Sequence, residues 1–244
     1  MRNINAVLCK ELKGYFETPV AYVLMVVFLM LTGMFTFYLG GFFDAEQANL
    51  LGFFDWHPWL YLFLMPAISM RLWAEERRSG TIEMLLTLPV STFESVMGKF
   101  IAAWLFAGVT LILTFPMWIT VNYLGDPDNG IIVLSYIGSF VMAGAFLAVG
   151  SSISAMTQNQ VVSFVVSITV CFLFTVSGFP IVIDFFSALN LPQFVIDTVS
   201  SFSFVQNFDD ISKGVLSLKN VVYFSSFIVF WLYINIVVID TKRA

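Results

Sequence analysis

Residues 129–183 read NGIIVLSYIGSFVMAGAFLAVGSSISAMTQNQVVSFVVSITVCFLFTVSGFPIVI and contain no charged side chain. A single helix of these 55 residues would be about 80 Å long, whereas the hydrocarbon core of a bilayer is about 30 Å thick. The stretch must therefore fold back on itself. Its most polar patch is Thr157-Gln158-Asn159-Gln160, where we expect the turn between two membrane spans.

The composition of the whole chain agrees with a membrane protein. Hydrophobic residues make up 59% of the 244 residues and charged residues only 11%, whereas a soluble domain carries roughly a quarter charged residues. Uncharged stretches of about 20 residues mark the spans. We expect an all-α integral membrane protein with a single transmembrane domain over 1–244 and six spans, at about 18–43, 56–74, 100–123, 131–154, 161–184 and 220–239.

The distribution of lysine and arginine sets the orientation. With the N-terminus inside, nine of these residues lie on the cytoplasmic side and only Lys213 and Lys219 lie outside, which is the bias that membrane insertion follows. Both termini are then cytoplasmic. Residues 185–208 leave an alternative open, because they are apolar enough for a seventh span. Asn190, Pro192 and Asp197 interrupt them, and we expect one or two short helices at the outer interface before span six.

Several classes of function find no support in the residues. A net charge of −5 is unlike the basic face of a nucleic-acid-binding protein. Gly98-Lys99 is followed by Phe100, and no P-loop occurs, so we expect no nucleotide site in this chain. No His, Cys, Asp or Glu cluster has the spacing of metal ligands, and nothing resembles a catalytic triad, so we expect no metal site and no catalytic residue. The one histidine, His57, stands between Trp56 and Trp59 and is expected at the membrane surface. Every charge lies near a span end, which argues against a secondary transporter coupled to ions.

Two segments on the cytoplasmic side are candidates for function. In residues 3–16, the apolar positions recur at helical spacing, which predicts an amphipathic helix in the inner interface. In the loop between spans two and three, Gly80 breaks the chain, Thr81 is a candidate N-cap, and Pro89 ends a helix of about two turns. This short helix presents Leu85 and Leu86 beside charged residues. A loop that only faced water would not be expected to expose such an apolar pair.

The loop at 76–91, ERRSGTIEMLLTLPVS, closely resembles the corresponding loop of ABC-2-type permeases, the membrane subunits of a class of bacterial ABC exporters. The similarity extends along most of the chain. The N-terminal helix, the turn within Ser151–Gln160 and the stretch from Asn207 to Val215 also resemble that family. The length and the N-terminal residues are most similar to the gliding-motility-associated permeases.

The resemblance implies partners and site residues. It implies a bacterial cytoplasmic membrane protein that works with a separate ABC ATPase, which binds ATP and magnesium, and with a second permease chain, the same or different. The ATPase contact would involve Glu76, Arg77, Arg78, Gly80, Thr81, Glu83, Leu85, Leu86 and Pro89 in the coupling segment, and Val7, Leu8, Lys10, Glu11 and Leu12 in the interfacial helix. The permease contact would use small residues, for which Gly144 and Ala148 have the spacing.

Two functions remain open at this point. The first is a permease that moves an unidentified substrate outward, driven by ATP hydrolysis in the partner. The alternative is a membrane scaffold that transmits force from the ATPase to envelope proteins and transports nothing.

Overall fold

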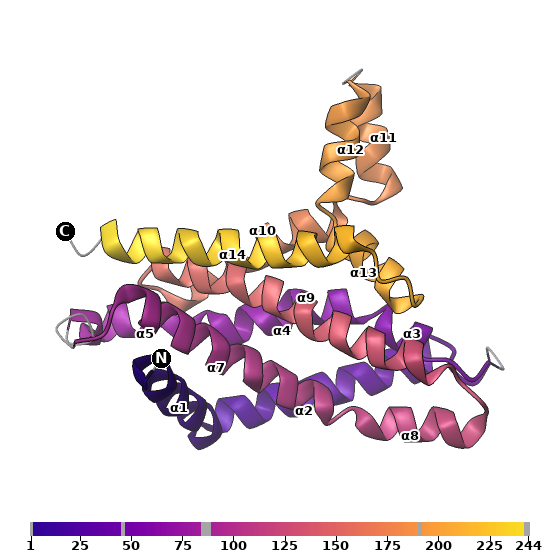
Figure 1. Ribbon diagram of the computed structural model, residues 1–244, viewed down its shortest axis with the longest axis horizontal. Helices are drawn as coiled ribbons and strands as arrows, with labels where there is room; N and C mark the ends of the chain where they lie inside the picture. The colour runs from indigo at the N-terminus through magenta and orange to yellow at the C-terminus, as the bar shows by residue number, and fades with distance from the viewer. Residues whose placement is uncertain (1, 45–46, 84–88, 190–191, 242–244) are drawn as a thin grey trace.

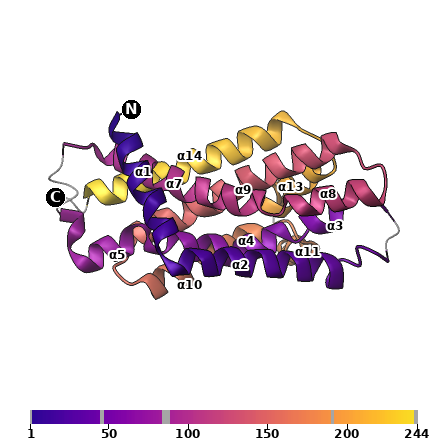
Figure 2. The same ribbon diagram turned by 90° about the horizontal axis from the view of Figure 1, so that it is seen from below.

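The computed structural model describes residues 2–44, 47–83, 89–189 and 192–241. These residues form helices and contain no β-strand. Most of the helices run along one axis and make an elongated bundle (Figure 1). The start of α1 (Arg2–Glu17) and the end of α14 (Leu218–Thr241) lie at the same end of the bundle (Figures 1 and 2).

Four helical segments are long and apolar enough to cross a membrane within the described ranges. They are α2 (Pro19–Met34) with the π-helical turn η1 (Phe35–Leu39), α7 (Thr92–Ile112) with α8 (Phe115–Leu124), α9 (Asn129–Met156), and α14. A fifth is obtained if α10 (Gln160–Val176) and α11 (Pro180–Ala188) count as one span. The six-span count therefore stays a prediction.

The predicted second span, 56–74, is divided in the structure. Its apolar part is α4 (His57–Ser69), only 13 residues long, and the charged helix α5 (Arg71–Ser79) follows after Met70. The short four-residue helix α3 (Leu51–Phe54) precedes α4. Most of α4 is buried against α9 and α10, so a short helix here lies inside the bundle rather than facing lipid on all sides.

Helix α9 is the centre of the bundle. It contacts α4, α5, α7, α10, α13 (Phe204–Ser212) and α14, and its C-terminal half is almost completely buried. The predicted reversal follows directly: α9 ends at Met156, and Asn159 caps α10 by accepting hydrogen bonds from the backbone N–H groups of Val161 and Val162. The turn expected at 157–160 is confirmed.

Span five is not the straight helix expected over 161–184. The chain bends by 80° between α10 and α11, at Ser177-Gly178-Phe179 before Pro180, a residue that cannot continue an α-helix because it lacks the backbone N–H. Helices α11 and α12 (Gln193–Ser201) then form a hairpin that projects across the bundle axis (Figure 1). Short helices before span six are therefore present, and the first of them begins at Pro180 rather than after residue 184.

Candidate functional site

A buried lysine joins three helices at the end of the bundle where the chain begins. Lys99 Nζ lies 2.9 Å from Glu11 Oε1 of α1 and 2.8 Å from Glu76 Oε1 of α5. It also lies 5.2 Å from the centre of the Trp73 ring, within the range of a cation–π contact. The Lys99 side chain is 2% exposed, and the two glutamates are 19% and 17% exposed. We call Lys99, Glu11 and Glu76 the ion triad.

The ion triad is a stiff connection because its charges are largely removed from water. Separating a buried ion from its partners leaves an uncompensated charge, which costs several kcal/mol. The ion pairs formed by other described residues, Lys13–Glu17, Arg71–Glu75 and Lys213–Asp209, join neighbours four residues apart on one helix and are more exposed. Among the ion pairs of the described residues, only those of the triad join separate helices, so a displacement of α1 or α5 would also act on α7.

Helix α1 is fixed along α7 by close backbone approach as well as by charge. A Cβ added at Gly98 would lie 2.7 Å from Val7 Cγ1 and 3.2 Å from the carbonyl oxygen of Ile4, so the glycine leaves the space that α1 occupies. At one end of α1, Asn3 Nδ2 donates to Glu94 Oε2 at 3.2 Å. At the other end, the Tyr15 ring stacks on Phe106 with centroids 5.0 Å apart.

Burial affects titration in this region. The pKa of the Tyr15 hydroxyl is raised well above its ordinary value, first by burial and second by the nearby charge of Glu11. Burial also lowers the pKa of the Arg77 guanidinium from its usual value. Both shifts have burial as their largest cause, and the strongest electrostatic contacts of the site are the two ion pairs of the triad.

A serine of the central helix holds the joint between α4 and α5. Ser154 Oγ accepts hydrogen bonds from the backbone N–H groups of Trp73 and Ala74, both at 3.1 Å, and donates to the Met70 carbonyl at 2.9 Å. The first N–H groups of a helix have no partner within the helix, so one buried side chain here satisfies two of them. The joint therefore connects α5 to the core of the bundle through α9.

The predicted coupling residues fall into two groups. Glu76 and Arg77 are half-buried, and the Glu76 carboxylate is used by Lys99 within the chain. Arg78, Gly80, Thr81, Glu83 and Pro89 are exposed, whereas Leu85 and Leu86 lie outside the described residues. Gly80 ends α5 with φ of +72°, a left-handed conformation that favours glycine, so the predicted break is confirmed. Thr81 bonds to the Ser79 hydroxyl and does not cap a backbone N–H in the part described.

The predicted residues of the interfacial helix lie on both the packed and the exposed sides of α1. Val7, Leu8, Glu11 and Leu12 are half-buried, whereas Lys10 is exposed. The Pro89 carbonyl accepts a hydrogen bond from Asn3 Nδ2 at 3.4 Å, so the start of α1 and the end of the coupling segment are adjacent. Asn3 and Pro89, from two segments that the sequence assigns to one face of the membrane, are therefore neighbours in the structure.

The predicted permease contact at Gly144 and Ala148 stays a prediction, and within this chain both positions serve helix packing. A Cβ on Gly144 would meet the Trp104 ring at 2.8 Å, so the glycine serves the packing of α9 against α7. Ala148 is completely buried. Small residues on the central helix of a bundle allow its own neighbours to approach, which is what these two positions do within this chain.

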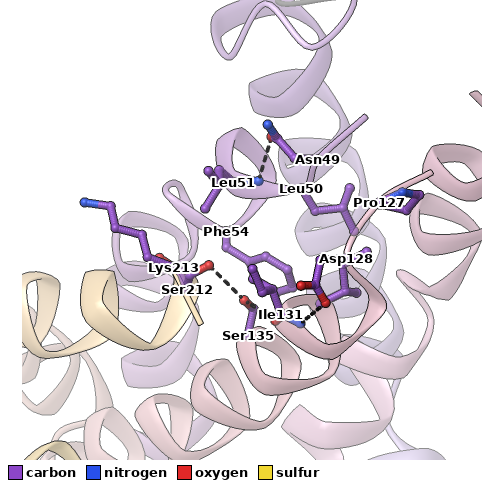
Figure 3. A pocket seen from close by; sticks show the side chains of 11 residues that line it. Asn49, Leu50, Leu51, Phe54, Pro127, Asp128, Ile131, Ser135, Ser212 and Lys213 are labelled. Atoms are coloured by element: carbon purple, nitrogen blue, oxygen red, sulfur yellow. Dashed lines mark hydrogen bonds between the residues drawn. The ribbon is translucent and has the colours of Figure 1, made fainter. Parts of the chain in front are cut away.

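The opposite end of the bundle contains a hollow of about 250 Å³ (Figure 3). Its lining is mainly apolar, from Leu50, Leu51, Phe54, Ile131 and Ile132, and its polar side chains already have partners. Asp128 Oδ1 caps α9 by accepting from the N–H groups of Gly130 and Ile131. Ser135 donates to the Ser212 carbonyl, as Figure 3 shows. The hollow therefore offers shape and apolar surface but no unpaired polar group.

His57 lies near this end of the bundle and is buried inside the protein, not exposed as a membrane-surface side chain would be. Its side chain is fully buried among aromatic rings, including Phe53 with centroids 4.7 Å apart and Phe54 at 5.1 Å. Close by, burial and the charge of Asp209 raise the pKa of the Asp55 carboxyl above its ordinary value. Groups of three or more metal-binding side chains do not occur within the described ranges.

Comparison with known families decides the class of the protein. The model of the ABC-2 family transporter protein matches residues 63–240, which include α5, the coupling segment and the lysine of the ion triad. The chain belongs to the ABC-2 transporter family. Among curated proteins, none matches it. Members of this family are the membrane component of ABC transporters rather than the nucleotide-binding subunit, so this chain is a multi-pass permease component. The match does not extend to the gliding-motility subfamily, which stays a prediction.

Proposed function

We propose that this chain is the permease subunit of an ATP-driven exporter of the bacterial cytoplasmic membrane, and that a separate ATPase chain binds the surface formed by α1, α5 and the coupling segment. The ion triad is the observation that carries this proposal. It connects the helices on that surface to α7, and Ser154 connects α5 to α9. Force applied at the surface then reaches two long helices of the bundle.

The charges on this surface suit a docking partner. Arg78 and Glu83 are exposed close to the glycine that ends α5, and Lys10 is exposed on α1. Exposed charges around an apolar contact steer association and fix its register more than they add affinity. Leu85 and Leu86 would supply the apolar contact, as the sequence pattern predicts.

The transport step itself uses binding and movement rather than chemistry in this chain. ATP and magnesium would be held by the partner, and the substrate would pass along the bundle surface toward a second permease. The outer apolar faces of α2 and α10 are among the surfaces that could meet that chain or lipid; Val23, Met30, Val161 and Val165 are some of their exposed side chains.

Reconstitution of the chain with its ATPase in proteoliposomes tests the proposal. Vesicles with the ATPase outside should hydrolyse ATP faster than the ATPase alone and accumulate a substrate inside, detected by mass spectrometry of the lumen after incubation with a lipid and peptide extract of the cells. Faster hydrolysis with no accumulated compound would favour the scaffold alternative. Hydrolysis that does not respond to this chain would contradict both.

A further inference from the structure

A groove of about 300 Å³ lies between the second half of α1 and the start of α5. Six charged side chains line it: Lys10, Glu11, Arg71, Glu75, Glu76 and Lys99. Thr18 also lines it, at the joint where the chain passes from α1 into the membrane-spanning α2. Arg71 is the first residue of the charged helix α5, which follows the apolar helix α4 after Met70. This change from apolar to charged residues, on both sides of the groove, is the pattern expected at the level of the lipid headgroups.

The charges within the groove do not cancel locally. Arg71 Nε and Glu75 Oε2 form an ion pair at 3.1 Å, which accounts for one charge of each sign. Lys99 is shared between Glu11 and Glu76, so the ion triad keeps one negative charge in excess. Lys10 is exposed and takes part in none of the ion pairs formed by the described residues. One positive charge without an ion-pair partner, on Lys10, thus lies next in the chain to Glu11, which shares the excess negative charge of the triad with Glu76.

We propose that this groove binds a phospholipid whose headgroup carries both a phosphate and a primary ammonium group. The phosphate lies against Lys10, and the ammonium donates to the Glu11 carboxylate. Glu11 remains 19% exposed and uses only Oε1 for Lys99, so its second oxygen is available to a donor. Phosphatidylglycerol has no ammonium group to pair with this carboxylate, and a quaternary ammonium headgroup has no N–H to give.

The surroundings favour a lipid over a soluble ligand. Beyond Thr18 the chain continues as α2, where Val20, Tyr22 and Val23 are exposed and apolar or aromatic. Acyl chains can lie against these side chains while the headgroup stays in the groove. A headgroup bound here would contact α1 next to Glu11, one of the three residues of the ion triad. The proposal does not depend on the direction of transport.

Native mass spectrometry of the full chain in detergent tests the proposal without the ATPase. The protein is mixed with equal amounts of phosphatidylethanolamine, its N-methyl, N,N-dimethyl and N,N,N-trimethyl derivatives, and phosphatidylglycerol. We expect retention to fall with each methyl group added and to be lowest for the trimethyl and glycerol headgroups. Equal retention of the ethanolamine and trimethyl lipids would overturn the proposal.

Variants locate the site. Lys10→Gln should lower retention of phosphatidylethanolamine about fivefold, the effect expected of one lysine at a membrane surface. Lys13→Gln is the matched control, because Lys13 is on the same helix, pairs with Glu17 and does not line the groove. Unchanged retention in Lys10→Gln would contradict the assignment. Millimolar glycerophosphoethanolamine should not displace the lipid, and displacement would show that the groove recognises the free headgroup instead.

Discussion

Lys99 Nζ lies 2.8 Å from Glu76 Oε1, which ties the start of α7 to the helix that precedes the coupling segment. The two residues are 23 positions apart, and Glu11, the other partner of Lys99, is 88 positions away. A single buried ammonium group therefore joins segments that the chain separates by a loop and by two membrane spans. The predictions below follow from this connection and from the contacts beside it.

Removing the lysine alone should destabilise the protein. Lys99→Met leaves two partly buried carboxylates without their counterion, which we expect to cost about 3 kcal/mol of folding stability. The measurement is the loss of folded protein on heating in detergent, followed by size-exclusion chromatography. Lys13→Met, at a side chain that is 79% exposed, should leave the thermal profile unchanged. A stable Lys99→Met protein would show that the triad contributes nothing to the fold.

Adding a methyl group at Gly98 should separate α1 from α7. The new Cβ would lie 2.7 Å from Val7 Cγ1, so we expect Gly98→Ala to destabilise by about 1–3 kcal/mol through overpacking. Hydrogen exchange of α1 amides should rise. Gly14→Ala, on α1 itself, is the control, because a Cβ added at Gly14 meets nothing within 4 Å. Equal exchange in the two variants would argue against close contact at Gly98.

Ser154→Ala should loosen the joint between α4 and α5. The substitution leaves the N–H groups of Trp73 and Ala74 and the Met70 carbonyl without their buried partner, at a cost of about 1–3 kcal/mol. Hydrogen exchange at Trp73 and Ala74 should increase selectively. Thr169→Ala provides the comparison, because Thr169 is on the α10 surface and bonds only to the Val165 carbonyl of its own helix. Unchanged protection of the Trp73 and Ala74 amides from hydrogen exchange in Ser154→Ala would contradict their hydrogen bonds to Ser154.

Reversing an exposed charge in the coupling segment should uncouple the ATPase. In Glu83→Lys we expect normal membrane insertion but little stimulation of ATP hydrolysis, because the side chain is exposed and contributes no described ion pair to the fold. Glu17→Lys reverses a charge that is 65% exposed at the other end of α1 and serves as the control. Full stimulation by Glu83→Lys would remove this residue from the docking surface.

Sequence patterns predicted the elements that depend on local chemistry. The polar run at 157–160, the glycine at position 80 and the amphipathic positions of α1 all lie where the structure has a turn, a left-handed helix end and a half-buried face. Each depends on residues within one or two helical turns. The reversal within the long uncharged run was forced by bilayer thickness alone.

The features that the sequence did not predict depend on distant contacts. Lys99 was one of nine lysines and arginines that the sequence assigns to the cytoplasmic side. No spacing in the sequence identifies its partners, because they lie on other helices. A lone lysine followed by a long apolar run was the available hint. The bend between α10 and α11 also had a local signal, Gly178-Phe179-Pro180, which the absence of charge up to residue 183 obscured.

The most direct test is the ATP hydrolysis rate of the ATPase reconstituted with a neutral triad. The variant Glu11→Gln/Glu76→Gln/Lys99→Met removes all three charges together, so it should fold and retain much of the wild-type thermal stability. If the ion triad transmits force from the docking surface to the spans, stimulation of hydrolysis by this variant should fall about tenfold, within the usual range of coupling free energies. A folded variant that stimulates hydrolysis as strongly as the wild-type chain would contradict the account.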